Sequence, residues 1–410
     1  MSGEFLFLSH RIPFPPNRGD KIRSHHVLKA LAAFAPVHVA TLADDAADLA
    51  EEPALAELAA SHCLVRRSKP LVLAGLQSLW QGQPVSLPAF YSPAVARYVE
   101  QVLATRPIGA IYVFSSQMGQ YVPASFSGRV IADFVDVDSA KFDAYGVAHG
   151  GVKGLIEARE GRLLRAEEAR LAERADVSIL ISQAEAALFR SRLTPAQRAN
   201  CAVQVLRNGI DASEFDPAKV EPAPELRALP GPKLIFTGQM DYAPNVAAVQ
   251  RAATRLVPLI RAQLPDASLH IVGRNPPEDV RALANLPGCN VWGGVPDMRT
   301  WLAGADLALV PLEIARGVQN KVLEAMAMRL PVVLTGAAAT GIDATLGKHY
   351  AIAESDTDLA EQALALLGDP ARSAAMGEAA RSFVTDDLNW PTVLAPLAKL
   401  MGQEGVRNAA

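Results

Sequence analysis

The chain alternates short runs of apolar residues with longer amphipathic stretches. The short runs are apolar on both faces, which is typical of strands in a parallel sheet covered by helices on both sides. In the first half we expect strands at residues 4–9, 37–43, 63–67, 110–116, 130–137 and 177–182. In the second half we expect them at residues 233–238, 268–273, 290–294, 307–312, 331–335 and 350–354.

The pattern runs twice, and a connection rich in Pro and turn residues separates the two runs at residues 207–232. We therefore predict an α/β protein with two doubly wound domains, at residues 1–200 and 201–385, rather than one domain with a single large sheet. Ligands of such folds bind beyond the carboxyl ends of the strands. Two domains that face each other would thus form a cleft lined by both.

Composition narrows the class of protein. Half of the residues are hydrophobic and 20% are charged, and the net charge of −4 gives no reason to expect nucleic acid as a partner. Three cysteines far apart in sequence favour a reducing compartment over a disulfide framework or a zinc site. The apolar run at residues 4–9 fits a first strand better than a signal peptide, and no apolar run is long enough to cross a membrane. We expect a cytoplasmic protein.

Residues 316–333 have the pattern of a helix that runs into a strand, with unusual charges on the helix. Arg316 and Lys321 are cations at a helix start, where they are unfavourable unless an anion binds. Glu324 lies among apolar neighbours and needs hydrogen-bond donors, for which ribose hydroxyls are suited. The pattern favours a nucleoside diphosphate as ligand, although a Lys321–Glu324 or Asn320–Glu324 pair in an ordinary helix has the same spacing.

Glycines at strand ends fit the same hypothesis. Gly238, Gly273 and the pair Gly293 and Gly294 each follow an apolar run, and glycine lets a ligand approach the backbone closely. An ordinary tight turn from strand to helix would also use glycine.

Two segments of the first half could carry chemistry. Asp136 and Asp138 end an apolar run, where carboxylates could orient a substrate or exchange protons, while Ser139 could cap the next helix. The loop after the first strand contains Gly19 and several charged residues, which also fit a solvated basic surface.

Together these stretches resemble the GT-B glycosyltransferases, specifically the retaining enzymes of family 4. The resemblance covers nearly the whole chain and is carried by residues 205–217, 236–249 and 305–333, most specifically by KVLEAMA at 321–327 before a Pro-led strand. It is closest to the sugar transferases found with bacterial exopolysaccharide and exosortase (PEP-CTERM) loci. It implies a GT-B fold with the donor in the C-terminal domain and the acceptor in the N-terminal domain. It also implies a terminal helix at residues 386–410, anchored by Trp390, that packs back across the domain junction.

The resemblance implies roles for individual residues. Glu324 matches the second Glu of the family's E-x₇-E motif, which binds ribose, whereas Arg316 stands where many members carry the first Glu. Gln239 and Asn245 stand where an Arg and a Lys often occur, so we expect the diphosphate to be held mainly by the start of the 316–333 helix. The expected donor-binding residues are Gly19, Gly238, Gln239, Asn245, Gly273, Arg274, Val295, Gly317, Val318, Gln319, Lys321 and Glu324. The expected catalytic residues are Asp136, Asp138 and Arg316.

The implied reaction moves a sugar from a nucleotide sugar to an acceptor with retention of anomeric configuration. Cations and a helix end can stabilise the leaving diphosphate, so no cofactor and no metal are expected. Residues 136–138 also match the D-x-D metal motif of a different, single-domain glycosyltransferase architecture. Two other functions fit the sequence: a GT-B nucleotide-sugar epimerase, and a non-catalytic nucleotide-sugar-binding protein.

The expected acceptor is a saccharide or a polyprenyl-diphosphate-linked one, reached at the inner face of the cell membrane during exopolysaccharide assembly. Residues 71–93 combine apolar side chains and Trp80 with three preceding cations, Arg66, Arg67 and Lys69. Such a stretch could rest on an anionic membrane as a peripheral contact. The expectation that we favour is a helical pair packed on the N-terminal sheet.

Overall fold

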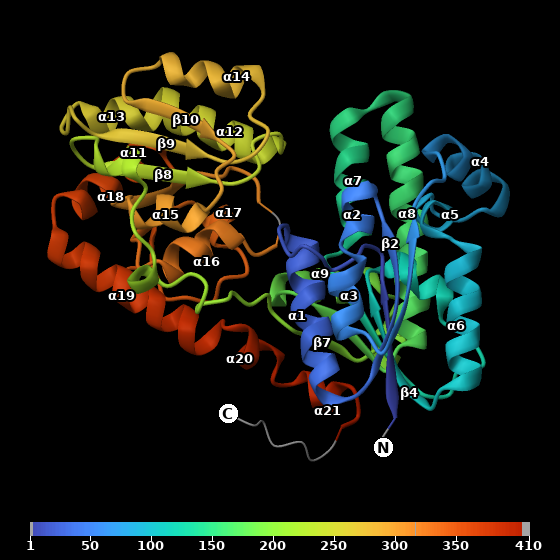
Figure 1. Cartoon of the computed structure of the whole chain (residues 1–410). Coiled ribbons are helices and arrows are strands. Elements are labelled where there is room, and N and C mark those ends of the chain that lie inside the picture. The colour runs from blue at the N-terminus through green and yellow to red at the C-terminus, as the bar shows by residue number, and fades with distance from the viewer. Residues whose placement is uncertain (1–2, 316, 404–410) are drawn as a thin grey trace. The chain divides into compact units, whose positions relative to one another are not determined.

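The computed structural model describes residues 3–315 and 317–403, which form two units. The first unit contains residues 1–207 and 393–410, and the second contains residues 208–392. Each unit is a parallel sheet between layers of helices (Figure 1), as the repeated apolar runs predict. The helices of the described residues are all too short or too polar to span a lipid bilayer.

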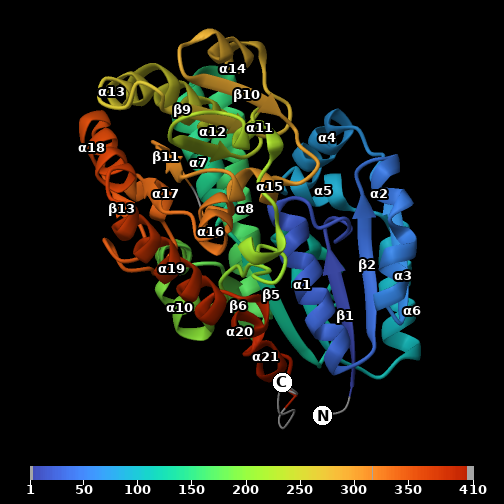
Figure 2. The ribbon, with the colours of Figure 1, turned by 60° about the vertical axis from the view of Figure 1, so that its left-hand side comes forward.

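The sheet of the first unit has seven strands in the order β3-β2-β1-β4-β5-β6-β7, and neighbouring strands run parallel. Figure 2 shows β1 and β2 side by side. The strands are β1 (Glu4–Ser9), β2 (Val37–Ala43), β3 (Ser61–Arg66), β4 (Ile108–Phe114), β5 (Arg129–Val135), β6 (Val177–Leu180) and β7 (Val203–Val205). The sequence did not predict β7, because its three residues include the polar Gln204 and carry little apolar signal.

Helices cover both faces of this sheet. They are α1 (Gly19–Phe34), α2 (Ala46–Ala50), α3 (Glu52–Leu58), α4 (Leu71–Gln81), α5 (Ser86–Phe90), α6 (Pro93–Thr105), α7 (Asp138–His149), α8 (Gly151–Arg174), α9 (Gln183–Arg192), α10 (Pro195–Asn200) and α21 (Leu397–Leu400). Helices α1 and α3 lie on one face, and α6 and α8 lie on the other (Figure 1). The returning helix α21 packs against α1.

The sheet of the second unit has six strands in the order β10-β9-β8-β11-β12-β13, again parallel. The strands are β8 (Lys233–Thr237), β9 (Ser268–Val272), β10 (Cys289–Gly293), β11 (Leu307–Val310), β12 (Val332–Leu334) and β13 (Ala351–Ile352). The helices are α11 (Pro224–Arg227), α12 (Ala243–Arg251), α13 (Val257–Arg261), α14 (Glu278–Arg281), α15 (Met298–Ala303), α16 (Asn320–Ala327), α17 (Gly336–Ala339), α18 (Asp356–Leu367) and α19 (Pro370–Asp387). Helix α20 (Trp390–Leu394) leads out of this unit, and the buried Trp390 packs on Gly209 within it.

In each sheet the first strand lies near the middle, and the chain adds strands first on one side of it and then on the other. The place where the order reverses is called the reversal point. In the first unit the reversal lies between β1 and β4, and in the second it lies between β8 and β11. The helices that follow the two strands at the reversal point lie on opposite faces of the sheet. The loops at the carboxyl ends of these strands therefore run in opposite directions and leave a crevice for a ligand. The topology therefore points to the loops after β8 and β11, and after β1 and β4.

A buried ion pair joins α1 to the centre of the first sheet. Arg23 Nε donates to Asp133 Oδ2 at 2.9 Å, the Tyr112 hydroxyl donates to the same oxygen at 2.6 Å, and both charged side chains are almost fully buried. Arg23 Nη1 also donates to the carbonyl of Arg207. Lys21 is buried as well and donates to Asp48 Oδ1 at 2.5 Å. Two cations that follow Gly19, Lys21 and Arg23, are thus buried and do not form the solvated basic surface that the sequence also allowed.

We predict that Asp133→Asn lowers the free energy of unfolding by about 3–5 kcal/mol, because it leaves the buried Arg23 charge without its counter-ion. Tyr112→Phe removes one hydrogen bond and no charge, so its expected cost is only about 1–2 kcal/mol. Urea denaturation of the three proteins measures both losses. Equal losses of unfolding free energy in the two variants would contradict the view that the Arg23–Asp133 ion pair contributes most to the attachment of α1 to the sheet.

Candidate functional site

Most of the residues expected to bind a donor lie beyond the carboxyl ends of strands of the second sheet. Gly238, Gln239 and Asn245 follow β8, while Gly273 and Arg274 follow β9. Residues 317–319 lie in the loop before α16, Lys321 lies in the first turn of α16, and Val295 follows β10. Of the described residues in the expected donor set, only Gly19 belongs to the first unit.

Lys321 lies in the first turn of α16, and its ammonium group contacts uncharged partners. Its Nζ donates to Asn245 Oδ1 at 2.9 Å and to Gln319 Oε1 at 3.3 Å, and it lies 5.2 Å from the centroid of the Phe236 ring. Burial lowers the pKa of Lys321 to about 8, against the opposing effect of the Glu324 charge. The position therefore holds a cation that has lost much of its hydration.

Glu324 lies one turn further along α16 with its side chain half-buried. Burial raises its pKa to about 7, the Lys321 charge opposes that rise, and the Glu214 charge adds to it. Among the described residues, no hydrogen bond or ion pair involves its carboxylate. The sequence pattern predicted this carboxylate among apolar neighbours, and the structure places Val322, Leu323 and Ala325 around it in the core.

Two glycines bring the ends of β8 and β9 into close contact. A Cβ atom on Gly273 would lie 1.6 Å from the carbonyl oxygen of Gly238, so no larger residue fits there. Gly238 has a φ of 151°, and a Cβ atom on it would lie 2.9 Å from Asn245 Nδ2. Asn245 Nδ2 in turn donates to the carbonyl of Gln239 at 2.8 Å. These contacts position Asn245 to accept from Lys321.

The helix starts later than the sequence suggested. We expected it to open at Arg316, but α16 begins at Asn320, and Gly317 has a φ of 64° that a helix does not allow. Gly317, Val318 and Gln319 therefore form the loop before the helix. Arg316 lies outside the described residues, so its expected role stays a prediction.

Sequence reasoning missed Phe236 as a neighbour of the lysine, although an aromatic residue one position before the end of a strand is a visible signal. Asn245 was expected among the donor-binding residues, but not as the acceptor for Lys321 that the structure shows.

Asp136 and Asp138 lie together in the first unit, after β5 and at the start of α7. Both accept from Lys141 Nζ, at 3.1 and 3.0 Å. Burial acts against the Lys141 charge, but the two carboxylates outweigh it and hold the pKa of Lys141 above its usual value. A metal ion at the D-x-D motif would have to displace this ammonium group. In the part of the chain that the structure describes, no three His, Cys, Asp or Glu side chains cluster as metal ligands would.

Ser139 does not cap α7, which was an alternative role that the sequence allowed. Its amide and its hydroxyl both donate to the carboxylate of Glu168 from α8, the amide at 2.9 Å and the hydroxyl at 2.5 Å. Burial raises the pKa of Glu168 to about 7, although the hydrogen bonds from Ser139 lower it. This carboxylate fixes the start of α7 and so the position of Asp138.

Gly19 is the exposed first residue of α1 at the reversal point of the first sheet. The neighbouring Asp20 accepts from Arg11 Nη1 and from Arg18 Nε, both at 2.7 Å. Despite partial burial, hydrogen bonds from His10 and Arg18 hold the pKa of Asp20 far below its usual value. The structure thus places Gly19 beside a fixed ionic cluster, in the unit that does not contain the other donor residues.

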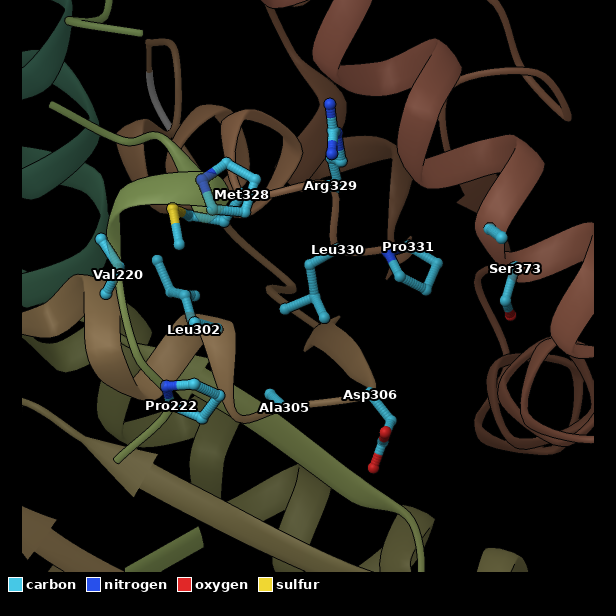
Figure 3. Close-up of a pocket in the computed structure, with 13 residues that line it drawn as sticks. Val220, Pro222, Leu302, Ala305, Asp306, Met328, Arg329, Leu330, Pro331 and Ser373 are labelled. Atoms are coloured by element: carbon cyan, nitrogen blue, oxygen red, sulfur yellow. The ribbon is translucent and has the colours of Figure 1, made fainter. Parts of the chain in front are cut away.

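A hollow of about 340 Å³ lies at the opposite edge of the second sheet (Figure 3). Leu302, Leu330 and Pro331 line it, near the amino ends of β11 and β12. Its carboxylate, Asp306, already accepts from the Lys233 amide at 2.8 Å. Its lining is mostly apolar and it is far from the carboxyl ends, so it is not the candidate site.

Comparisons with known proteins agree with this geometry. Residues 231–369 match the family model described as glycosyl transferases group 1, and this range contains every expected donor-binding residue except Gly19. The chain is 98% covered by HepE of Anabaena, solved in complex with UDP and glucose, with 99% of that chain matched, a TM-score of 0.66 and 16% identity. The fold is GT-B.

Two curated relatives are similar over a little more than half of this chain. A GDP-mannose-dependent monoacylated alpha-(1-6)-phosphatidylinositol monomannoside mannosyltransferase of Corynebacterium glutamicum is 30% identical over 56% of this chain. A GDP-mannose-dependent alpha-(1-6)-phosphatidylinositol monomannoside mannosyltransferase of Mycolicibacterium smegmatis is 29% identical over 58% of it. The match spans 62% of the length of the first relative and 66% of the second.

We predict that Glu324→Gln stabilises the ligand-free protein at pH 8 and has much less effect at pH 5. The folded protein holds a proton on Glu324 up to a pH of about 7, whereas the unfolded chain releases it near its ordinary value of 4.5. Stability of the natural protein therefore falls as the pH rises through this window, and the variant avoids a loss of about 2–3 kcal/mol. Denaturant unfolding at both pH values measures the difference. Glu361→Gln, on an exposed position of α18, is the control. An equal gain for Glu324→Gln at both pH values would contradict the raised pKa of Glu324.

Proposed function

We propose that this chain is a retaining glycosyltransferase that binds a nucleotide sugar at the carboxyl edge of the second sheet. The observation that carries the proposal is the combination of Lys321, a half-buried cation at a helix start, and Glu324, a carboxylate for which the described residues provide no hydrogen-bond donor, near the reversal point of a doubly wound sheet. The match of residues 231–369 to group 1 glycosyl transferases supports it. So do the two mannosyltransferase relatives.

The proposed chemistry follows from the charges at the site. A nucleoside diphosphate leaves as an anion, which the Lys321 ammonium and the N–H groups at the start of α16 would stabilise. Gly317, Val318 and Gln319 would contribute backbone groups, and Arg316 would add a second cation. The Glu324 carboxylate would accept from ribose hydroxyls, which favour its charged form. No metal is needed for these interactions.

For the donor we propose a nucleotide sugar, without a choice between a guanine and a uracil base. Both mannosyltransferase relatives are named for GDP-mannose, and HepE was solved with UDP. In the proposed site Gly273, Arg274 and Val295 would meet the base through backbone groups, while Gly238, Gln239 and Asn245 would line the phosphates. Both nucleotides therefore belong in a first panel.

The acceptor is proposed to be a saccharide carried on a lipid, such as a polyprenyl diphosphate, in bacterial exopolysaccharide assembly. The names of both relatives include a phosphatidylinositol monomannoside, which is a lipid-linked sugar. Asp136 and Asp138 would orient the acceptor or the transferred sugar, with Lys141 holding the two carboxylates in place. Gly19 would lie near the donor.

We predict that Lys321→Gln weakens binding of a nucleoside diphosphate by about 10- to 100-fold and binding of the free nucleoside by less than about threefold. The ammonium would contact phosphate and not the base or ribose, which explains the difference. Arg316→Ala is expected to show the same selectivity. Calorimetry with GDP, UDP and their nucleosides measures both constants, and Lys348→Gln, an exposed lysine of the same unit, is the control. Equal losses for both ligand types would argue against the phosphate role.

We also predict transfer from one donor of a panel that includes GDP-mannose and UDP-glucose to a polyprenyl-diphosphate-linked saccharide. Mass spectrometry detects the product, and NMR of the new linkage reports whether the anomeric configuration is retained. Glu324→Ala should lower kcat/KM by about 100-fold, because a ribose contact made in the transition state is lost. Conversion of the free nucleotide sugar without acceptor would instead identify an epimerase. Tight nucleotide binding without turnover would identify a binding protein.

A further inference from the structure

Helix α4 presents its large apolar side chains to solvent. Trp80 is 86% exposed and Leu76 is 60% exposed, and Val72 and Leu79 are exposed on the same side of the helix. The inward side carries the small residues Ala74 and Ser78. An ordinary surface helix has the reverse arrangement. The expectation that this stretch packs its apolar residues on the sheet is thus wrong for α4, although α5 does bury Leu87 and Ala89.

Polar contacts hold α4 in this orientation. Arg159 of α8 donates through Nη1 to the Ser78 hydroxyl and through Nη2 to the Ser78 carbonyl, both at 3.1 Å. The neighbouring Glu160 accepts from the Val85 amide at 2.9 Å, just beyond the end of α4. The apolar side of α4 therefore faces outward because its polar, small-residue side is fixed to α8.

A second exposed apolar segment lies where α7 turns into α8, the helix that holds α4. Val147 is 88% exposed, and Val152, Leu155 and Ile156 are exposed in the first turns of α8. Ile156 lies one helical turn before Arg159, whose side chain reaches Ser78 of α4. We call the combined surface the apolar face; its residues are Val72, Leu76, Leu79, Trp80, Val147, Val152, Leu155 and Ile156.

Exposed cations flank both segments of the apolar face, although Arg67 pairs with Asp44 at 2.9 Å and Glu157 directly follows Ile156. No Asp or Glu occurs between Glu57 and Glu100, a stretch that contains Arg66, Arg67 and Lys69 just before α4. No Asp or Glu occurs between Asp143 and Glu157, and Lys153 in that segment is exposed. A face of this kind is complementary to an apolar surface with negative charge at its edge, as an anionic lipid bilayer presents.

We propose that the apolar face docks on the surface of an anionic membrane, with Trp80 and the neighbouring leucines among the headgroups. A second copy of the chain fits less well, because a twofold contact would bring the exposed cations Arg66 and Lys153 of the two copies together. The proposal stands on exposure and charge and does not depend on sugar transfer. Vesicle binding and transferase activity therefore fail or succeed separately.

The test uses the full chain with vesicles of phosphatidylcholine alone and vesicles that also contain phosphatidylglycerol. The double variant Leu76→Gln/Trp80→Gln should reduce binding to the anionic vesicles at least tenfold, and Leu155→Gln should also reduce it. Leu346→Gln is the matched control, because Leu346 is 61% exposed in the second unit. The natural protein should bind the anionic vesicles more tightly at low salt than at high salt.

Tryptophan fluorescence gives an independent readout. Trp301 and Trp390 are buried and Trp292 is 37% exposed in the second unit, whereas Trp80 is 86% exposed. A blue shift on vesicle addition that the double variant lacks therefore reports on Trp80. Lipids brominated near the headgroup should quench it. Equal binding by the double variant and the control would overturn the proposal. So would vesicle-free self-association in ultracentrifugation that the double variant abolishes, because the face would then be an interface between copies.

Discussion

The dehydration of Lys321 is the constraint on which the candidate site depends. An ammonium group loses favourable hydration when it is buried, and the amide oxygens of Asn245 and Gln319 and the ring of Phe236 replace only part of it. Glu324 stays one turn away without a hydrogen bond to the lysine, and both groups titrate near neutral pH. A phosphate anion at the lysine and hydroxyl donors at the glutamate would satisfy both groups at once. In the proposed complex, the bound nucleotide would thus offset the cost of burying both groups.

The fold makes this arrangement unavoidable once the strand order is set. The strands β8 and β11 are neighbours, and the helices that follow them, α12 and α16, both begin at the carboxyl edge of the sheet beside these two strands. Asn245 near the start of α12 then meets Lys321 near the start of α16, although 76 residues separate them. Gly273 and Gly238 let the backbone of β8 and β9 close tightly beside this meeting point. The starts of α12 and α16 supply backbone N–H groups, and Gly238 and Gly273 at the strand ends contribute backbone without side chains of their own.

The sequence predicted the elements better than their contacts. Short runs that are apolar on both faces are typical of buried strands in a parallel sheet, so the two doubly wound domains followed from local composition. The GT-B fold followed from the resemblance carried by residues 205–217, 236–249 and 305–333. The start of α16 was misplaced because Gly317 is equally compatible with a helix and with the left-handed turn that it adopts. The pairs Arg23–Asp133 and Lys321–Asn245 join residues far apart in sequence, and a single sequence holds no signal for such pairs. Glu324 was predictable because a lone carboxylate in an apolar run is visible locally.

Helix α4 shows how a polar anchor can keep an apolar surface exposed. Its outward residues contribute little to the core, while Arg159 and Ser78 provide the attachment that burial usually provides. Burial of one large apolar side chain stabilises by about 1.5–3 kcal/mol, so four such residues on α4 offer on the order of 6–12 kcal/mol on contact with an apolar phase. The loss of translational and rotational freedom on association costs a comparable amount, about 4–15 kcal/mol. The balance gives attachment that is reversible and that depends on the added attraction of Arg66 and Lys153 to negative charge.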